Sequence, residues 1–400
     1  MKPKYTILIG AFSAALLSVA SAAPIVINIT GATAFRDAAD GAIIALLGGD
    51  NVAFRARTDI ILSGTSASNL RIYRGTTTGG TEYIVRATYS GSTAGILAVA
   101  DQADLPFLRT DTTMVQTGPG SFAGTLAANT VIAKPRYSFS DVDKLLSQRP
   151  NAPLGGGPVG VVPFMFVAGE SAPAGVTNMT DQLHNSLWSL GRVPASLFTG
   201  NSADVGFRIY ATGRNNGSGT RASILSETQY GSFTNVAQFN STVTGNATGA
   251  LTGSPFLFPD DLGLGNGGHT SNSTVRGLLN RTSNPAFRSG AYAFVSYLTV
   301  SDATGATGYV PATGLIVGGE GAKPMTYNGV RYSVDNVNNG AYSLWGFQQL
   351  YIADGATQQE LDFFDLLAAQ IPTNMGIAGL PISGLAVDRT GGDGGAIVPK

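Results

Sequence analysis

The chain of 400 residues has no cysteine, so it can form no disulfide and offers no cysteine for a lipid anchor. It has only two histidines, and charged residues make up 12% of it, about half of their usual share. Basic residues number 24 and acidic residues 25, and removal of Lys2 and Lys4 leaves 22 basic residues and a net charge of −3. Such a chain is not a polycation that binds nucleic acid.

After the N-terminus, the sequence also lacks a run of about 20 apolar residues, the length needed to span a membrane. At the N-terminus, Lys2 and Lys4 precede an apolar run from residue 6 to residue 19, and Ala20-Ser21-Ala22 forms an A-x-A cleavage site. We therefore expect residues 1–22 to be a signal peptide. The mature protein is expected to be soluble in the periplasm or secreted, and not embedded in the membrane.

What the chain has in plenty is glycine, with 53 residues, and one glycine-rich segment is the most informative. It reads Tyr-Ala-Thr-Gly-Arg-Asn-Asn-Gly-Ser-Gly-Thr, from Tyr210 to Thr220, and joins a strand-like stretch to a helix-like one. Backbone N–H groups at a helix start, free hydroxyls and the fork of Arg214 suit a tetrahedral oxyanion. Gly217 and Gly219 let the backbone approach a ligand closely. The alternative interpretation is an ordinary turn with a serine or threonine N-cap.

Other segments repeat this arrangement. Two more strand-to-helix junctions combine glycine with serine or threonine: Gly31-Ala32-Thr33-Ala34-Phe35 and Gly91-Ser92-Thr93-Ala94-Gly95. A fourth segment, Tyr137 to Asp143, places the pair Ser140-Asp141 before a helix-like stretch. Each junction would direct hydroxyl or N–H groups from a helix start, so together they favour a shared anion site over isolated caps.

The order of these segments resembles the periplasmic phosphate-binding proteins of ABC importers, within the type II solute-binding superfamily. That family has an Arg-x-x-Gly-Ser-Gly-Thr motif, which Arg214 to Thr220 match without a gap. Its first turn has threonine directly before phenylalanine, where this chain has Ala34, so contact by Thr33 or only by the Phe35 N–H stays open. The resemblance implies phosphate contacts from Thr33, Phe35, Ser92, Asp141, Arg214, Ser218, Gly219 and Thr220.

The resemblance also implies the fold. It is an α/β fold of two lobes, each a mixed, mostly parallel sheet flanked by helices, with the ligand cleft between the lobes. Alternating strand and helix patterns agree with this class. We expect lobe I to comprise residues 23–160 with 338–400, and lobe II residues 161–337. The Gly- and Pro-rich stretch 153–158 looks like a linker, and 159–167 like a buried strand that passes between the lobes.

The implied chemistry is binding without catalysis. Arg214 would hold two phosphate oxygens, and Asp141 would accept a hydrogen bond from a protonated phosphate oxygen, which sulfate lacks at neutral pH. Asp141 would also pair with Arg214 across the cleft. We expect no catalytic residue, no metal and no cofactor, because no nucleophile lies beside a base in the sequence pattern. His184, Trp188 and Trp345 are expected to be packing residues and His269 a loop residue.

The sequence therefore predicts an exported, monomeric solute-binding protein that captures inorganic phosphate or a similar oxyanion and delivers it to an ABC importer permease. One alternative keeps the fold but has no transporter partner, as in a secreted protein that scavenges phosphate. Another is an all-β surface or adhesive protein in which the turns are coincidental, as the low charge and abundant Gly, Ser, Thr and Asn allow.

Overall fold

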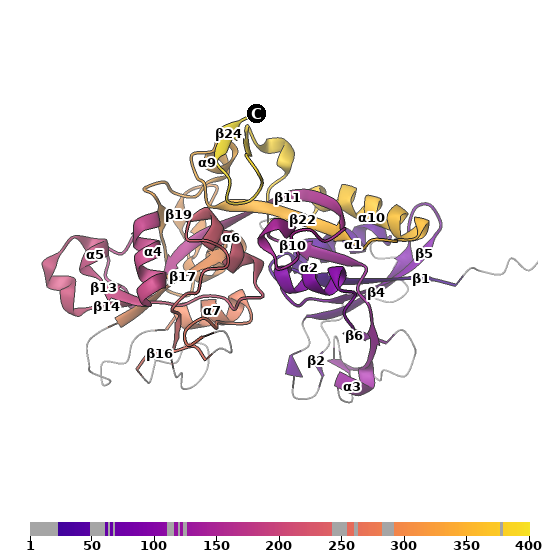
Figure 1. The fold of residues 1–400 in the computed structure, drawn as a ribbon, viewed down its shortest axis with the longest axis horizontal. Helices are drawn as coiled ribbons and strands as arrows, with labels where there is room; N and C mark the ends of the chain where they lie inside the picture. The colour runs from indigo at the N-terminus through magenta and orange to yellow at the C-terminus, as the bar shows by residue number, and fades with distance from the viewer. Residues whose placement is uncertain are drawn as a thin grey trace, which may run out of the picture.

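The computed structural model describes residues 23–48, 61–62, 65–66, 69–109, 116–118, 121–122, 126–241, 254–259, 263–281, 292–376 and 379–400. The expected signal peptide lies outside these residues. Within them, the chain forms strands and helices in alternation around one large mixed sheet (Figure 1). The helices exclude the all-β alternative. No helix of the described part has both the length and the apolar character needed to cross a membrane.

The central sheet has ten strands and spans the whole molecule. In spatial order it consists of β13 (Arg192–Pro194), β14 (Arg208–Ala211), β17 (Tyr292–Thr299), β11 (Gly155–Ala168), β22 (Trp345–Ile352), β10 (Tyr137–Ser140), β1 (Ile25–Gly31), β5 (Glu82–Thr88) and β4 (Leu70–Thr76), with β20 (Lys323–Pro324) paired to β11. We call the strands from β22 to β4, with their helices, the first half, and those from β17 to β13, with theirs, the second half.

Strand β11 joins the two halves. Its residues 155–163 pair with β22 and its residues 164–168 pair with β17, both in antiparallel fashion. The buried strand expected at 159–167 is thus confirmed, but the expected linker is wrong from Gly155 on. The reason is that β22 offers a backbone partner: Gly156 pairs with Tyr351 at a φ of +93°, where a Cβ would lie 2.2 Å from the Leu350 carbonyl oxygen.

In the first half, β1 runs parallel to both β10 and β5, while β4 and β5 form an antiparallel hairpin. Three helices accompany these strands: α1 (Arg36–Leu46), α2 (Ser92–Ala100) and α10 (Gln358–Gln370). Helix α10 begins at a capping box, in which Thr357 and Glu360 satisfy each other's backbone N–H groups. The side chains of α10 and β10 meet in the core, where Tyr137 packs edge-on against Phe364.

The second half pairs β14 with β17 in parallel. Its helices are α4 (Asp181–Leu190), α5 (Ser196–Thr199), α6 (Gly219–Glu227), α7 (Asn272–Leu279) and α8 (Val300–Thr307). Trp188 and Trp345 are fully buried, and His184 stacks on Trp188 with ring centroids 4.5 Å apart, which confirms their expected packing roles. The mixed sheet is confirmed as well, although antiparallel pairs outnumber parallel ones among its described strands.

Shorter elements decorate both halves. They are β2 (Ile61–Leu62), β3 (Thr65–Ser66), β6 (Leu105–Leu108), β7 (Gln116–Gly118), β8 (Ser121–Phe122), α3 (Leu126–Asn129), β9 (Thr130–Ala133), β12 (Asn178–Met179), β15 (Phe239–Asn240), β16 (Phe256–Leu257), β18 (Tyr309–Val310), β19 (Leu315–Ile316), β21 (Thr326–Tyr327), α9 (Val334–Asn338), β23 (Val387–Arg389) and β24 (Ile397–Pro399). The hairpin β23–β24 at the C-terminus lies above the middle of the molecule, near the boundary of the two halves (Figure 1).

Candidate functional site

The two halves meet where helices α2 and α6 begin. A Cβ placed on Gly219, the first residue of α6, would lie 2.3 Å from the Ser92 hydroxyl oxygen, and one on Gly91 would lie 2.7 Å from the Gly217 carbonyl oxygen. Thr93 also donates a hydrogen bond to the Asn216 carbonyl oxygen at 3.4 Å. Glycine at these positions therefore allows the backbone of one half to touch the other.

Asp141 follows β10 and lies inside this contact with an exposed fraction of 2%. Its backbone N–H donates to the Ser92 hydroxyl at 3.2 Å, and its carboxylate Oδ2 accepts from the Thr220 hydroxyl at 3.1 Å. The other carboxylate oxygen, Oδ1, is buried and has no hydrogen-bond partner within the described part of the chain. The structure thus brings Ser92, Asp141 and Thr220 together, as the resemblance implied.

This environment shifts the protonation of Asp141. Burial raises the pKa of its carboxyl group, while the neighbouring Ser92 hydroxyl, the positive charge of Arg214 and the hydrogen bond from Thr220 act against that rise. A buried carboxylate with one unused oxygen is costly unless a donor approaches it. The free oxygen is therefore suited to accept a hydrogen bond from a ligand that carries a proton.

Arg214 follows β14 and is equally buried, with an exposed fraction of 2%. Its Nε donates to the His269 carbonyl oxygen at 3.2 Å, Nη1 to the Asn272 side-chain oxygen at 2.8 Å, and Nη2 to the Thr270 carbonyl oxygen at 3.0 Å. A guanidinium group has five N–H donors. Within the described part of the chain, these three bonds leave one N–H donor on Nη1 and one on Nη2 for an anion.

The expected pairing of Asp141 with Arg214 takes a weaker form than a direct ion pair. Their charges attract each other, and burial, the main effect, lowers the pKa of Arg214 while Asp141 opposes that change. The hydrogen bonds of the guanidinium go instead to residues 269–272 of its own half. Carbonyl and amide oxygens hold Arg214, and no carboxylate of the described ranges bonds to it, so its charge is available to an anion.

Asn272 is a residue of this site that the sequence did not reveal. It is the first residue of α7, and its Nδ2 donates to the Asp302 carboxylate at 3.0 Å while its oxygen accepts from Arg214. His269 lies in the loop before α7, and burial lowers the pKa of its ring to about 4, so the imidazole is neutral at physiological pH. The only sequence signal was the glycine-rich loop that precedes this helix.

The start of α6 supplies further donors. The Ser218 hydroxyl accepts from the Arg221 backbone N–H at 3.4 Å and so caps the helix, which leaves its own hydrogen free to donate. The first N–H groups of a helix have no acceptor within the helix, and here they belong to Gly219 and Thr220. Ser218 is thus an N-cap, as the alternative interpretation held, and its contact with a ligand stays a prediction.

The first turn lies at the edge of the site. Phe35 precedes α1 without a side-chain cap, and its ring packs against Phe139 with centroids 5.5 Å apart. Thr33 lines a cavity of about 760 Å³, together with Asn272 and other residues from the starts of α1 and α7. This cavity lies between the two halves. None of the contacts of the described residues joins Thr33 or Phe35 to Asp141 or Arg214, so their ligand contacts stay predictions.

No family model matches the chain, and no curated protein does. Among solved structures, it is similar to an ABC-type phosphate transport receptor from Vibrio cholerae, with 15% identity, a TM-score of 0.44, and coverage of 88% of this chain and 98% of that one. It is also similar to a putative phosphate ABC transporter substrate-binding protein with bound phosphate from Clostridium perfringens, with 12% identity, a TM-score of 0.48, and coverage of 89% and 99%. An OxyR mutant from Corynebacterium glutamicum is similar at 9% identity and a TM-score of 0.39, over 90% of this chain and 68% of that one. We therefore infer the ligand of this chain from its own residues.

Proposed function

We propose that this protein binds inorganic phosphate, or a similar tetrahedral oxyanion, between its two halves and catalyses no reaction on it. The observation that carries the proposal is that Asp141 and Arg214, both buried in this site, each have hydrogen-bonding capacity that no described residue uses. Among the described residues, none donates to the Oδ1 atom of Asp141, and none accepts from the remaining N–H on each terminal nitrogen of Arg214. A partly protonated oxyanion satisfies both, because it has acceptor oxygens for Arg214 and an O–H group for Asp141.

The magnitudes agree with tight binding. A dissociation constant of about 1 μM corresponds to about −8 kcal/mol. Hydrogen bonds to charged groups contribute roughly 1.5–3 kcal/mol each. The fork of Arg214, the bond to Asp141 and the donors of Ser218, Gly219 and Thr220 together exceed that requirement, which leaves free energy to offset closure of the halves.

The same proposal assigns roles to the rest of the chain. Residues 23–160 with 338–400 form lobe I and residues 161–337 form lobe II, with β11 and β22 as the connection that bends when the lobes open. The protein acts as a monomer outside the cytoplasm, after removal of residues 1–22, and passes its ligand to an ABC importer permease. Co-purification with the permease of the same cell, from cells that produce both, tests this last role, and failure to co-purify favours a scavenger without a transporter.

Titration calorimetry of Arg214→Met tests the ligand. Removal of one charged partner from a buried site costs about 2–5 kcal/mol, so we expect the phosphate affinity to fall at least tens of fold. Arg208→Met is the matched control, because Arg208 lies on β14, the strand that precedes Arg214, and is exposed; among the described residues its side chain bonds only to the Val205 carbonyl oxygen. Titration heats that are the same for Arg214→Met, Arg208→Met and the unchanged protein would refute the assignment.

A further inference from the structure

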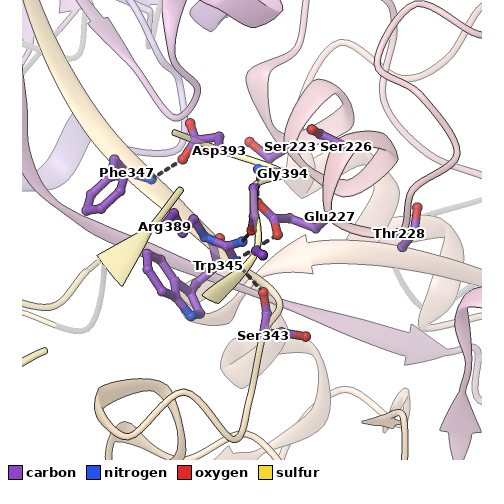
Figure 2. Close-up of polar contacts among 12 residues, drawn as sticks. Ser223, Ser226, Glu227, Thr228, Ser343, Trp345, Phe347, Arg389, Asp393 and Gly394 are labelled. Atoms are coloured by element: carbon purple, nitrogen blue, oxygen red, sulfur yellow. Dashed lines mark hydrogen bonds and ion pairs between the residues drawn. The ribbon is translucent and has the colours of Figure 1, made fainter. Parts of the chain in front are cut away.

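Residues 389–395, which comprise the last residue of β23 and most of the loop that leads to β24, reach both halves of the molecule near the proposed site. Figure 2 shows Asp393 directed toward Phe347 and Glu227 directed toward Gly394 and Arg389. Arg389 and Asp393 of this segment are buried, each with an exposed fraction of 7%.

Asp393 holds the chain next to Asp141. Its Oδ2 accepts a hydrogen bond from the Asp143 backbone N–H at 2.8 Å, and its Oδ1 accepts from the Phe347 backbone N–H, also at 2.8 Å. Asp143 is two residues beyond Asp141, and Phe347 lies on β22. Both oxygens of this carboxylate thus serve to fix the turn that carries Asp141 against β22, the strand of the first half that lies next to β11.

Glu227 connects the same loop to α6. It is the last residue of the helix whose first residue, Gly219, belongs to the proposed site. Its two carboxylate oxygens accept from the Gly394 backbone N–H at 2.7 Å and from Arg389 at 2.7 Å. A helix of nine residues is a stiff rod of about 13 Å. The contacts of Glu227 at the C-terminal end of α6 therefore also fix the position of its N-terminal end, at Gly219.

Arg389 and Gly394 bring this loop into contact with β22 and with α6. Arg389 stacks on the Trp345 ring at 4.2 Å and donates to the Ser343 and Trp345 carbonyl oxygens, which anchors it to the start of β22. Gly394 has a φ of +79°, and a Cβ on it would lie 1.9 Å from the Ser226 hydroxyl oxygen. Only glycine lets the loop lie this close to α6.

We propose that residues 389–395 form a clasp that holds the Asp141 turn and helix α6 together in the closed arrangement of the two halves, with Asp393 and Glu227 as positioning residues. Neither residue touches the ligand. The clasp acts from behind the site, on Asp143 in the first half and on the end of α6 in the second. This inference rests on the proposed function where affinity is concerned, but the closure itself can be measured without any ligand.

The closure is measured by energy transfer between two dyes. Because the chain has no cysteine, cysteines introduced at Ile132 and Leu264 are the only labelling sites. Ile132 lies on β9 of the first half with an exposed fraction of 63%, and Leu264 lies in the second half with 71%. In the absence of phosphate, we expect Asp393→Ala to lower the transfer efficiency. Asp388→Ala is the matched control on the same hairpin, because Asp388 is exposed and its side chain accepts, from the residues that the structure describes, only the neighbouring Arg389 N–H. It is expected to leave the transfer unchanged.

Affinity and rates provide the second measurement. With phosphate, Asp393→Ala should bind at least tenfold more weakly through faster dissociation, and Asp393→Asn, which keeps one acceptor oxygen, should fall between it and the unchanged protein. If Asp393→Ala does not fold, Asp393→Asn and Glu227→Gln replace it. If the folded variants at Asp393 and Glu227 show the same energy transfer as the unchanged protein, the clasp proposal is wrong. Absence of phosphate binding by the unchanged protein overturns the proposed function instead, and the energy transfer still decides on the clasp.

Discussion

Replacement of Asp141 by asparagine tests how the site distinguishes phosphate from sulfate. Thr220 donates to Oδ2 of Asp141 at 3.1 Å, whereas Oδ1 has no partner among the described residues. In Asp141→Asn the amide oxygen takes the Oδ2 position, because only the oxygen can accept from Thr220. The NH₂ group then takes the Oδ1 position. An acceptor that faces the ligand becomes a donor, with almost no change in shape.

The size of the effect follows from this exchange. Monohydrogen phosphate loses one hydrogen bond to a charged group, about 1.5–3 kcal/mol. With about 1.4 kcal/mol per factor of ten, its affinity should fall by at most about 10- to 150-fold. Relief of the repulsion between carboxylate and anion reduces this loss. Sulfate has no proton to donate at neutral pH, so it gains a donor and loses the repulsion, and its affinity should rise.

Calorimetric titrations with phosphate and with sulfate at pH 7 measure both changes. Asp143→Asn is the control, since its side chain caps the following short helix through the Leu145 N–H and lies in the same turn. Asparagine is an equally good cap, so this variant should behave as the unchanged protein does. If Asp141→Asn still excludes sulfate and binds phosphate without loss, Asp141 does not select the ligand.

Three further outcomes are expected. Asn272→Ala removes the acceptor at 2.8 Å from Arg214 Nη1, and calorimetry should show at least tenfold weaker phosphate binding; equal affinity would mean that Asn272 does not orient Arg214. Gly219→Ala places a Cβ 2.3 Å from the Ser92 hydroxyl oxygen, so affinity should fall at least tenfold at nearly unchanged melting temperature. In Gly277→Ala, by contrast, the new Cβ meets no atom within 4 Å, and any equal loss there would contradict the steric reasoning. Burial raises the pKa of Glu227 to about 8 and that of Asp393 to about 6, above the values of about 4.3 and 3.9 in unfolded chains. The folded protein thus holds more protons, and its free energy of unfolding should decrease as the pH rises from about 5 to 8; thermal melts should show a smaller decrease for Glu227→Gln, and a melting temperature that rises with pH would contradict the sign.

Local features were predictable from the sequence because short-range physics decides them. Glycine with serine or threonine between a strand pattern and a helix pattern predicted the starts of α1, α2 and α6. The buried run at 159–167 predicted a strand. The linker expected at 153–158 failed for a tertiary reason, since pairing with β22 makes a strand of residues that have no strand preference of their own.

What the chain alone determined is which segments present hydroxyl, N–H and guanidinium groups at the ends of strands and the starts of helices. Only the tertiary structure decided that Ser92, Asp141 and Thr220 meet, that residues 269–272 orient Arg214, and that the C-terminal loop holds both halves. The reason is the distance along the chain: Asp393 bonds to a residue 250 positions earlier. No local pattern encodes such a contact, because the partner is a backbone N–H that every residue but proline has.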